Sequence, residues 1–188
     1  LLIIVSLLVT FFGMIFMDPM LRAFGASSNT IVYAKEFITI ILAGAVLQNL
    51  GFGLNNIIRS EGNPKKAMTT MLIGCILNIV LDFIFIYIFN FGIKGAATAT
   101  VISQAVNTIW VISYFRGKNS LLKLKAENFK LEKEVVISIF AIGMSPFAMQ
   151  IAASLVNVIL NKKLGIYGGD LAIGAFGIIN SIATIILM

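Results

Sequence analysis

The 188-residue sequence has no histidine, one cysteine and few charged side chains. The absence of histidine excludes a Ser-His hydrolase site, an HExxH zinc site and a histidine proton relay within this stretch. The single Cys75 excludes a disulfide within it and suggests no cysteine-ligated metal. No glycine-rich phosphate loop follows a strand pattern. The net charge of +6 is scattered rather than clustered with aromatics, so nucleic acid is not an expected partner.

Hydrophobic residues make up 59% of the sequence and charged residues 12%, with a mean hydropathy of +1.01. That leaves too little polar side chain to cover a soluble domain. A membrane-spanning helix needs roughly 20 predominantly apolar residues. Six stretches meet or approach this length: 1–17, 37–58, 67–93, 95–115, 135–161 and 171–188. We therefore expect an all-α fold, a polytopic transmembrane helix bundle.

The basic residues between these stretches predict how the bundle is oriented. Short cytoplasmic loops carry an excess of Lys and Arg. Nine lie in the connections after the second and fourth stretches: Arg59, Lys65, Lys66, Arg116, Lys118, Lys123, Lys125, Lys130 and Lys133. Five lie in the alternate connections: Arg22, Lys35, Lys94, Lys162 and Lys163. We therefore place "RSEGNPKK" and the 116–134 segment in the cytoplasm, and "MDPMLRAFGASS" and "FNFGIKG" outside.

Residues 116–134 form the longest polar segment, "RGKNSLLKLKAENFKLEKE". Its leucines and its phenylalanine lie among lysines, a pattern typical of an amphipathic piece at the membrane surface. A solvated linker explains the same composition equally well. In either case this segment would join two helix bundles.

One charge lies inside an apolar stretch: Asp82, in "NIVLDFIFIYIF". A carboxylate at membrane depth costs about 2.5–3.5 kcal/mol, so an intramembrane acid indicates a functional site. Asn78 lies four residues earlier and therefore on the same helical face. Hard cations prefer oxygen ligands, and this pair supplies two. The pair is either a cation site or a buried hydrogen-bonding pair that fixes helix packing.

Three segments resemble consecutive signatures of the multidrug and toxic compound extrusion (MATE) family, in its bacterial branch. They read "LRAFGASSNTIVYAKEFITIIL", "LNNIIRSEGNPKKAMTTMLIGCILNIVLDFIFIYIF" and "GIKGAATATVISQ". The resemblance covers nearly the whole chain and implies a central fragment of a twelve-helix, two-lobe transporter. Residues 1–115 would be helices three to six of the first lobe, 116–134 the cytoplasmic interlobe linker, and 135–188 helix seven and part of helix eight.

The resemblance implies an antiporter that exports cationic or amphipathic compounds in exchange for H⁺ or Na⁺. Asp82, Asn78 and Thr100 would form a cation site together with an aspartate from a helix outside this sequence. If the cation is a metal ion, the resemblance implies Na⁺. Phe83 stands where the family commonly has proline, which leaves a kink there in doubt. The coupling ion is the only expected cofactor. Expected partners are small-molecule substrates, membrane lipids and the missing helices, in a bacterial inner membrane.

The second half offers weaker signals. Gln150, Asn157 and Asn161 fall at spacings of seven and four, so they share one stripe of a helix that faces either a substrate cavity or a packing neighbour. Pro146 lacks an amide hydrogen and predicts a kink, either a bending point or a static feature.

Two other functions stay open: a lipid-linked oligosaccharide or polysaccharide flippase, and a structural membrane subunit. A membrane enzyme is not expected, since one embedded acid gives no acid–base pair.

Overall fold

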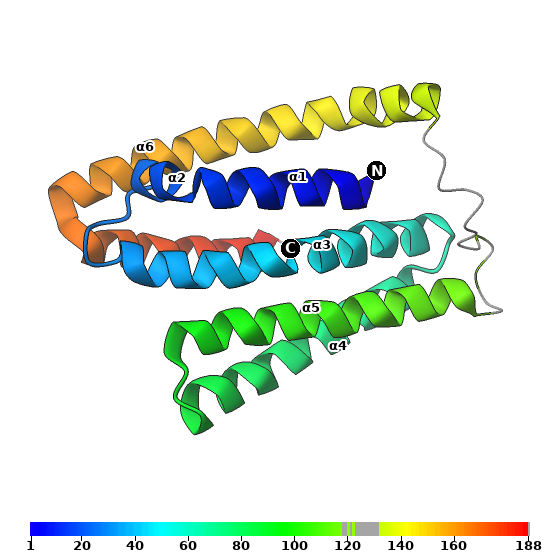
Figure 1. The fold of residues 1–188 in the computed structure, drawn as a ribbon, viewed down its shortest axis with the longest axis horizontal. Helices are drawn as coiled ribbons and strands as arrows, with labels where there is room; N and C mark the ends of the chain where they lie inside the picture. The colour runs from blue at the N-terminus through cyan, green and yellow to red at the C-terminus, as the bar shows by residue number, and fades with distance from the viewer. Residues whose placement is uncertain (118–119, 121, 123–131, 188) are drawn as a thin grey trace. The chain divides into compact units, whose positions relative to one another are not determined.

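The computed structural model describes residues 1–117, 120, 122 and 132–187, and every regular element in these ranges is a helix (Figure 1). The predicted all-α fold is therefore confirmed. Most of the proposed amphipathic segment, including Leu121, Leu124, Phe129 and Leu131, lies outside the described residues. The elements in order are α1 (Leu2–Ile15), α2 (Met17–Ala23), α3 (Ile31–Ser60), α4 (Pro64–Phe83), the π-helix η1 (Ile84–Ile88), α5 (Gly92–Arg116) and α6 (Lys133–Leu187).

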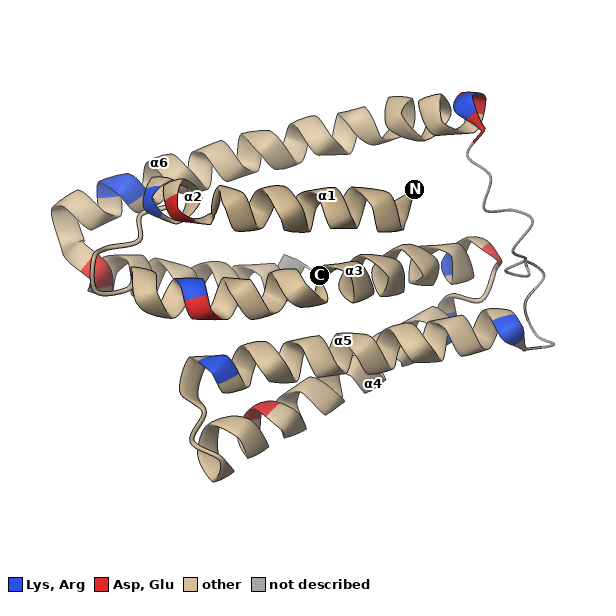
Figure 2. Ribbon diagram, viewed as in Figure 1, with Lys and Arg blue, Asp and Glu red and all other residues tan. Residues whose placement is uncertain are grey.

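Four of these helical segments are long and apolar enough to cross a membrane, namely α3, α4 with η1, α5 and α6. A fifth span results if α1 and α2, which meet at a 76° bend, count as one broken helix. Charged residues lie mainly near the helix ends (Figure 2). The chain is accordingly a membrane protein.

Local sequence explains where the helices end. Pro64 is the first residue of α4, where its missing amide hydrogen leaves no bond unmade, and Gly62 adopts a φ of 82° in the turn before it. Asn90 and Gly92 adopt φ values of 55° and 54°, which reverse the chain so that α5 packs back along α4 and η1. These helices therefore form an antiparallel hairpin.

The predicted connection at 162–170 is wrong in extent, because α6 stays helical through most of it. Backbone angles leave the helical region at Gly169, with φ 66° and ψ −166°. Lys162 and Lys163 are good helix formers, so polarity alone does not end a helix there. Pro146 lies inside α6, and the predicted kink at that position stays a prediction.

The chain divides into two compact units. The first unit contains Leu1–Phe16 and Lys35–Glu132, and the second contains Met17–Ala34 and Lys133–Met188. Residues 17–34 thus group with the second half of the chain. The proposed lobe boundaries at 1–115, 116–134 and 135–188 cut the chain differently and stay a prediction.

Small residues let α3 and α5 approach closely in the first unit. A Cβ atom on Gly44 would lie 2.6 Å from a Val101 methyl carbon, and one on Gly51 would lie 2.5 Å from the Thr108 hydroxyl oxygen. That hydroxyl donates a hydrogen bond to the Leu47 carbonyl at 2.7 Å. Close backbone approach through glycine and interhelical hydroxyl bonds are the usual means of packing helices in lipid.

A small core with one buried amide lies near the turn between α3 and α4. Its apolar members are Leu54, Ile58, Ala67, Val111 and Phe115. Asn55, only 3% exposed, donates hydrogen bonds to the Ala67 carbonyl at 3.0 Å and to the Thr70 hydroxyl at 2.6 Å. Because its donors are satisfied, this amide can be buried among apolar side chains at low cost.

Glu61, in the turn between α3 and α4, holds the chain that follows α5. Its carboxylate accepts hydrogen bonds from the Tyr114 hydroxyl at 3.0 Å, the Ser120 hydroxyl at 2.8 Å and the Leu122 amide at 2.9 Å. Burial raises the pKa of the Glu61 carboxyl, but the bonds from Leu122, Ser120 and Tyr114 outweigh it and hold the pKa below its ordinary 4.5. The ionised carboxylate therefore anchors the start of the predicted linker.

Acidification is expected to release this anchor. A group whose pKa is lower in the folded state stabilises the fold above its unfolded pKa, and that stability is lost as the pH falls through the folded pKa. The melting temperature of the detergent-solubilised full-length protein should therefore fall below about pH 4.5. Glu61→Gln should melt lower than the parent at neutral pH and lose less on acidification. Glu132→Gln, an exposed acid, is the control, and identical pH profiles for all three proteins would disprove the anchor.

Candidate functional site

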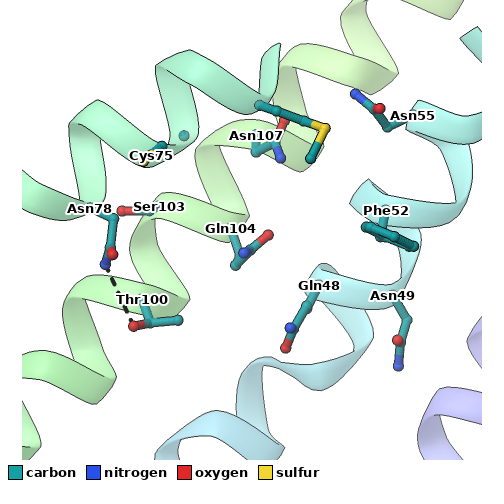
Figure 3. Close-up of a pocket in the computed structure, with 12 residues that line it drawn as sticks. Gln48, Asn49, Phe52, Asn55, Cys75, Asn78, Thr100, Ser103, Gln104 and Asn107 are labelled. Atoms are coloured by element: carbon teal, nitrogen blue, oxygen red, sulfur yellow. Dashed lines mark hydrogen bonds between the residues drawn. The ribbon is translucent and has the colours of Figure 1, made fainter. Parts of the chain in front are cut away.

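A polar cavity of about 420 Å³ lies between α3, α4 and α5 in the first unit (Figure 3). No charged side chain lines it among the residues the structure describes. Amides dominate its wall, and they come from all three helices. The lining residues are Gln48, Asn49, Phe52, Asn55, Met71, Gly74, Cys75, Asn78, Thr100, Ser103, Gln104 and Asn107. The cavity can therefore offer a bound molecule both hydrogen-bond donors and acceptors.

Two of the predicted site residues meet in this wall. The Asn78 side-chain amide on α4 donates to the Thr100 hydroxyl oxygen on α5 at 3.5 Å (Figure 3). The Thr100 hydroxyl itself donates to the Ala96 carbonyl at 3.0 Å, as hydroxyls in helices commonly do. Both residues are half-buried.

Asp82 lies one helical turn beyond Asn78, on the same face of α4, and is half-buried. It does not line the cavity, and no hydrogen bond joins it to Asn78 or Thr100 in the described part of the chain. Its Oδ1 is shielded from solvent and has no hydrogen-bond partner among the described residues. A shielded carboxylate oxygen without a partner is costly, so it requires a proton, a cation or a donor from elsewhere.

The predicted cation ligands are all side chains with an oxygen atom. The described residues contain no cluster of three or more His, Cys, Asp or Glu side chains. Asp82, Asn78 and Thr100 offer one carboxylate and two neutral oxygens. Such oxygen ligands match H⁺ exchange or Na⁺, and not the soft ligands that zinc or copper select.

Directly after Asp82 and Phe83 the helix widens into the π-helix η1. The Phe89 amide donates to the Ile84 carbonyl at 3.0 Å, the five-residue spacing of a π-helix, and the Phe91 amide reaches the Phe85 carbonyl at 2.9 Å. π-Helical turns are rare and occur frequently at functional sites. An irregular backbone therefore follows the acid even though Phe83 occupies the position of the family's proline.

The predicted polar stripe of the second half lies elsewhere. Gln150 is exposed, while Asn157 and Asn161 are half-buried, all in the second unit. Asn161 donates to the Phe24 carbonyl at 3.2 Å, so it makes a packing contact. None of the three lines the cavity of the first unit. Their assignment to a substrate cavity stays a prediction.

Sequence reasoning did not assign the amides of α3 and α5 to a site. Their spacing contained a signal, because Gln48 and Asn55 are seven residues apart, and Gln104 and Asn107 follow Thr100 by four and seven. These spacings place each set on one helical face. What the spacing does not show is that the two faces enclose one cavity.

Comparison with known proteins identifies the family. Residues 1–84 match the MatE family model. The multidrug export protein MepA of Staphylococcus saprophyticus is 30% identical over 175 residues, which is 93% of this chain. The chain belongs to the MATE family. MepA of Staphylococcus aureus is 31% identical over 176 residues, or 94% of the chain. The MATE chain described here spans 38% and 39% of these two relatives.

Solved structures share the fold. A multidrug resistance MATE transporter in an inward-facing conformation matches with a TM-score of 0.83 and 30% identity, covering 93% of this chain and 41% of that one. An outward-facing MATE structure matches with a TM-score of 0.83 and 29% identity, covering 98% and 41%. The all-α arrangement of this chain is therefore that of a segment of a two-lobe MATE transporter.

Proposed function

We propose that the full-length protein is a cation-coupled antiporter that exports drugs and other cationic or amphipathic compounds. The observation that carries the proposal is the unpartnered, shielded Oδ1 of Asp82, one turn from the Asn78–Thr100 pair. The family and the two MepA relatives support multidrug export. The coupling ion is H⁺ or Na⁺.

Coupling requires that ion binding and drug binding influence one another. Asn78 and Thr100 provide a route, because both line the polar cavity, and Asn78, which bonds Thr100, lies one helical turn from Asp82. An ion at Asp82 that draws on the oxygens of these two residues would change the wall of the cavity. The ion then shifts the conformational equilibrium by its difference in affinity for the two states.

The cavity supports a small amphipathic substrate. Its volume of about 420 Å³ falls in the usual range for ligand pockets, and Phe52 and Met71 add apolar surface to the amides. The Asn107 Oδ1 atom is shielded and has no partner in the described part of the chain, so it can accept a hydrogen bond from a bound molecule.

A flippase for lipid-linked oligosaccharides or polysaccharides is supported less well. Such substrates carry phosphate groups, which call for Lys or Arg side chains. No described basic residue lines the cavity. A structural subunit without transport would require neither a polar cavity nor an intramembrane acid.

Ethidium efflux from vesicles that contain the full-length protein tests the proposal. We expect efflux when either a proton or a sodium gradient is imposed, and the effective gradient identifies the ion. Efflux that is absent with both gradients, from protein that is correctly folded, would contradict cation-coupled drug export.

We place the protein in a bacterial inner membrane, with the α3–α4 turn on the cytoplasmic side. In a full-length Cys75→Ser background, Ser60→Cys should react with membrane-impermeant maleimide only from the cytoplasmic side. Asn90→Cys, in the α4–α5 turn, should react only from outside, because nine of fourteen basic residues lie in the predicted cytoplasmic connections. The reverse labelling pattern would invert the orientation and leave the fold unchanged.

A further inference from the structure

In the second unit, the loop between α2 and α3 is hydrogen-bonded to α6 around its bend. The Ser27 hydroxyl donates to Asp170 Oδ2 at 2.9 Å, across 143 residues of sequence. The Asn161 side-chain amide donates to the Phe24 carbonyl at 3.2 Å, across 137 residues. Two independent hydrogen bonds thus join a loop of the first half of the chain to a helix of the second.

The backbone on both sides of this contact is shaped by glycine. Gly25 has a φ of 96°, and a Cβ atom there would lie 3.3 Å from the Asn161 Cβ. Gly169 has a φ of 66°, so α6 turns immediately before Asp170. Left-handed angles of this kind favour glycine. The contact is therefore built by the local backbone of both segments and not by side chains alone.

Ser27 also lies in the turn at residues 27–30, which precedes α3. Its amide donates to the Thr30 hydroxyl at 2.9 Å, and the Thr30 amide donates to the Ser27 hydroxyl at 3.3 Å. This reciprocal pair, together with the Ile31 amide bonded to the Ser27 carbonyl at 3.0 Å, fixes the turn that leads into α3. Asp170 is thereby tied through Ser27 to the turn that precedes α3.

We propose that Phe24, Ser27, Asn161 and Asp170 form a latch that closes the predicted outer face of the transporter. The charge pattern of the sequence places the α2–α3 loop and the α6 bend on the same, outer side. Phe24 and Ser27 belong to the predicted first lobe and Asn161 and Asp170 to the predicted second, and the structure groups all four in its second compact unit. In a transporter whose lobes rock against each other, a contact between the lobes on one face must break when that face opens. That the latch opens once in each transport cycle rests on the proposed function, whereas the contact itself does not.

Hydrogen bonds suit this role because they break at moderate cost. The bond from Ser27 to Asp170 has a carboxylate as its acceptor, and charge-assisted bonds of this kind are the stronger class. Residues of the loop also line a small cavity of about 320 Å³, together with Leu21 and Ile173. Release of the latch would expose this cavity, which gives a measurement independent of transport.

A reversible cross-link tests whether the latch must open. Ser27→Cys and Asp170→Cys are combined in full-length protein that also carries Cys75→Ser. We expect an oxidant to form the disulfide and reduce ethidium efflux to the level of cells without the transporter, and a reductant to restore it. Failure to cross-link in folded protein would show that the contact does not form. Full cross-linking with unchanged efflux would show that it need not open.

Labelling of Ile173→Cys by impermeant maleimide tests whether the latch shields the cavity. In the same background, Asp170→Ala should speed labelling on the order of tenfold, as expected for loss of one charge-assisted hydrogen bond. Thr30→Ala is the comparison variant, because it removes the hydroxyl that bonds the Ser27 amide and leaves Asp170 in place. Equal labelling rates in the parent, Asp170→Ala and Thr30→Ala would overturn the latch. Neither this measurement nor cross-link formation depends on efflux, so failure of the transport proposal is recognised separately.

Discussion

Asp82→Asn is expected to abolish gradient-driven efflux while the protein still folds and inserts into the membrane. Asparagine has nearly the same shape but neither ionises nor exchanges a proton at neutral pH. Removing the charge also removes the cost of a carboxylate at membrane depth, about 2.5–3.5 kcal/mol, so insertion should not suffer. Drug resistance of cells, compared at equal protein levels in the membrane, measures the effect.

The neighbouring oxygens provide graded controls for this variant. Asn78→Ala and Thr100→Ala each remove a neutral group and their 3.5 Å contact, so each should weaken efflux less than Asp82→Asn. Glu36→Gln is a matched loss of one acid on a spanning helix, where the ion pair of Glu36 with Lys94, at 3.1 Å, is a surface contact. It should retain efflux. Resistance at the wild-type level in Asp82→Asn would return Asp82 to a packing role.

The second large effect is expected from Gly51→Ala in α3. The added Cβ atom would lie 2.5 Å from the Thr108 hydroxyl oxygen, closer than such atoms approach. Either that hydroxyl must leave its hydrogen bonds to the Leu47 and Gln104 carbonyls, or α3 and α5 must separate. Overpacking of this kind typically costs about 1–3 kcal/mol. The melting temperature of the purified full-length protein should fall accordingly, and less protein should accumulate in the membrane.

Thr108→Ala supplies a matched suppressor. It removes the clashing oxygen, and the next Thr108 atom, Cβ, would lie 3.5 Å from the new Cβ, which is ordinary contact. Thr108→Ala alone loses the bond to the Leu47 carbonyl and should be mildly destabilised. The double variant should therefore melt above Gly51→Ala. Simple addition of the two effects would show that the close α3–α5 approach is not what Gly51 permits.

Hydrophobic length and local rules predicted much of the fold. The apolar stretches are helical, Pro64 begins α4, and the reversal at Asn90–Gly92 gives the α4–α5 hairpin. The end of the predicted 135–161 helix was misplaced, because Lys162 and Lys163 marked a polar segment without stopping the helix. The backbone leaves the helical region at Gly169, which has a positive φ. Several other glycines lie nearby, and nothing in the sequence distinguishes Gly169 from them.

The candidate site was predictable only where its residues are close in sequence. Asn78 and Asp82 share a face by their four-residue spacing alone. Thr100 entered through the family resemblance, since a contact across 22 residues depends on how two helices pack. The π-helix after Phe83 gave no signal, because Ile84–Ile88 contains only large apolar and aromatic residues. Likewise, Glu61 and Tyr114 are 53 residues apart and are brought together by the fold.

Ion exchange at Asp82 is the central claim, and proton release tests it most directly. Protonation and cation binding should compete for the same carboxylate oxygens, so adding sodium or a cationic drug to the purified full-length protein should release protons. In weakly buffered detergent solution the parent should release up to one proton per protein at this site, and Asp82→Asn should release none from it. Equal proton release from the parent and Asp82→Asn would contradict the assignment of ion coupling to Asp82.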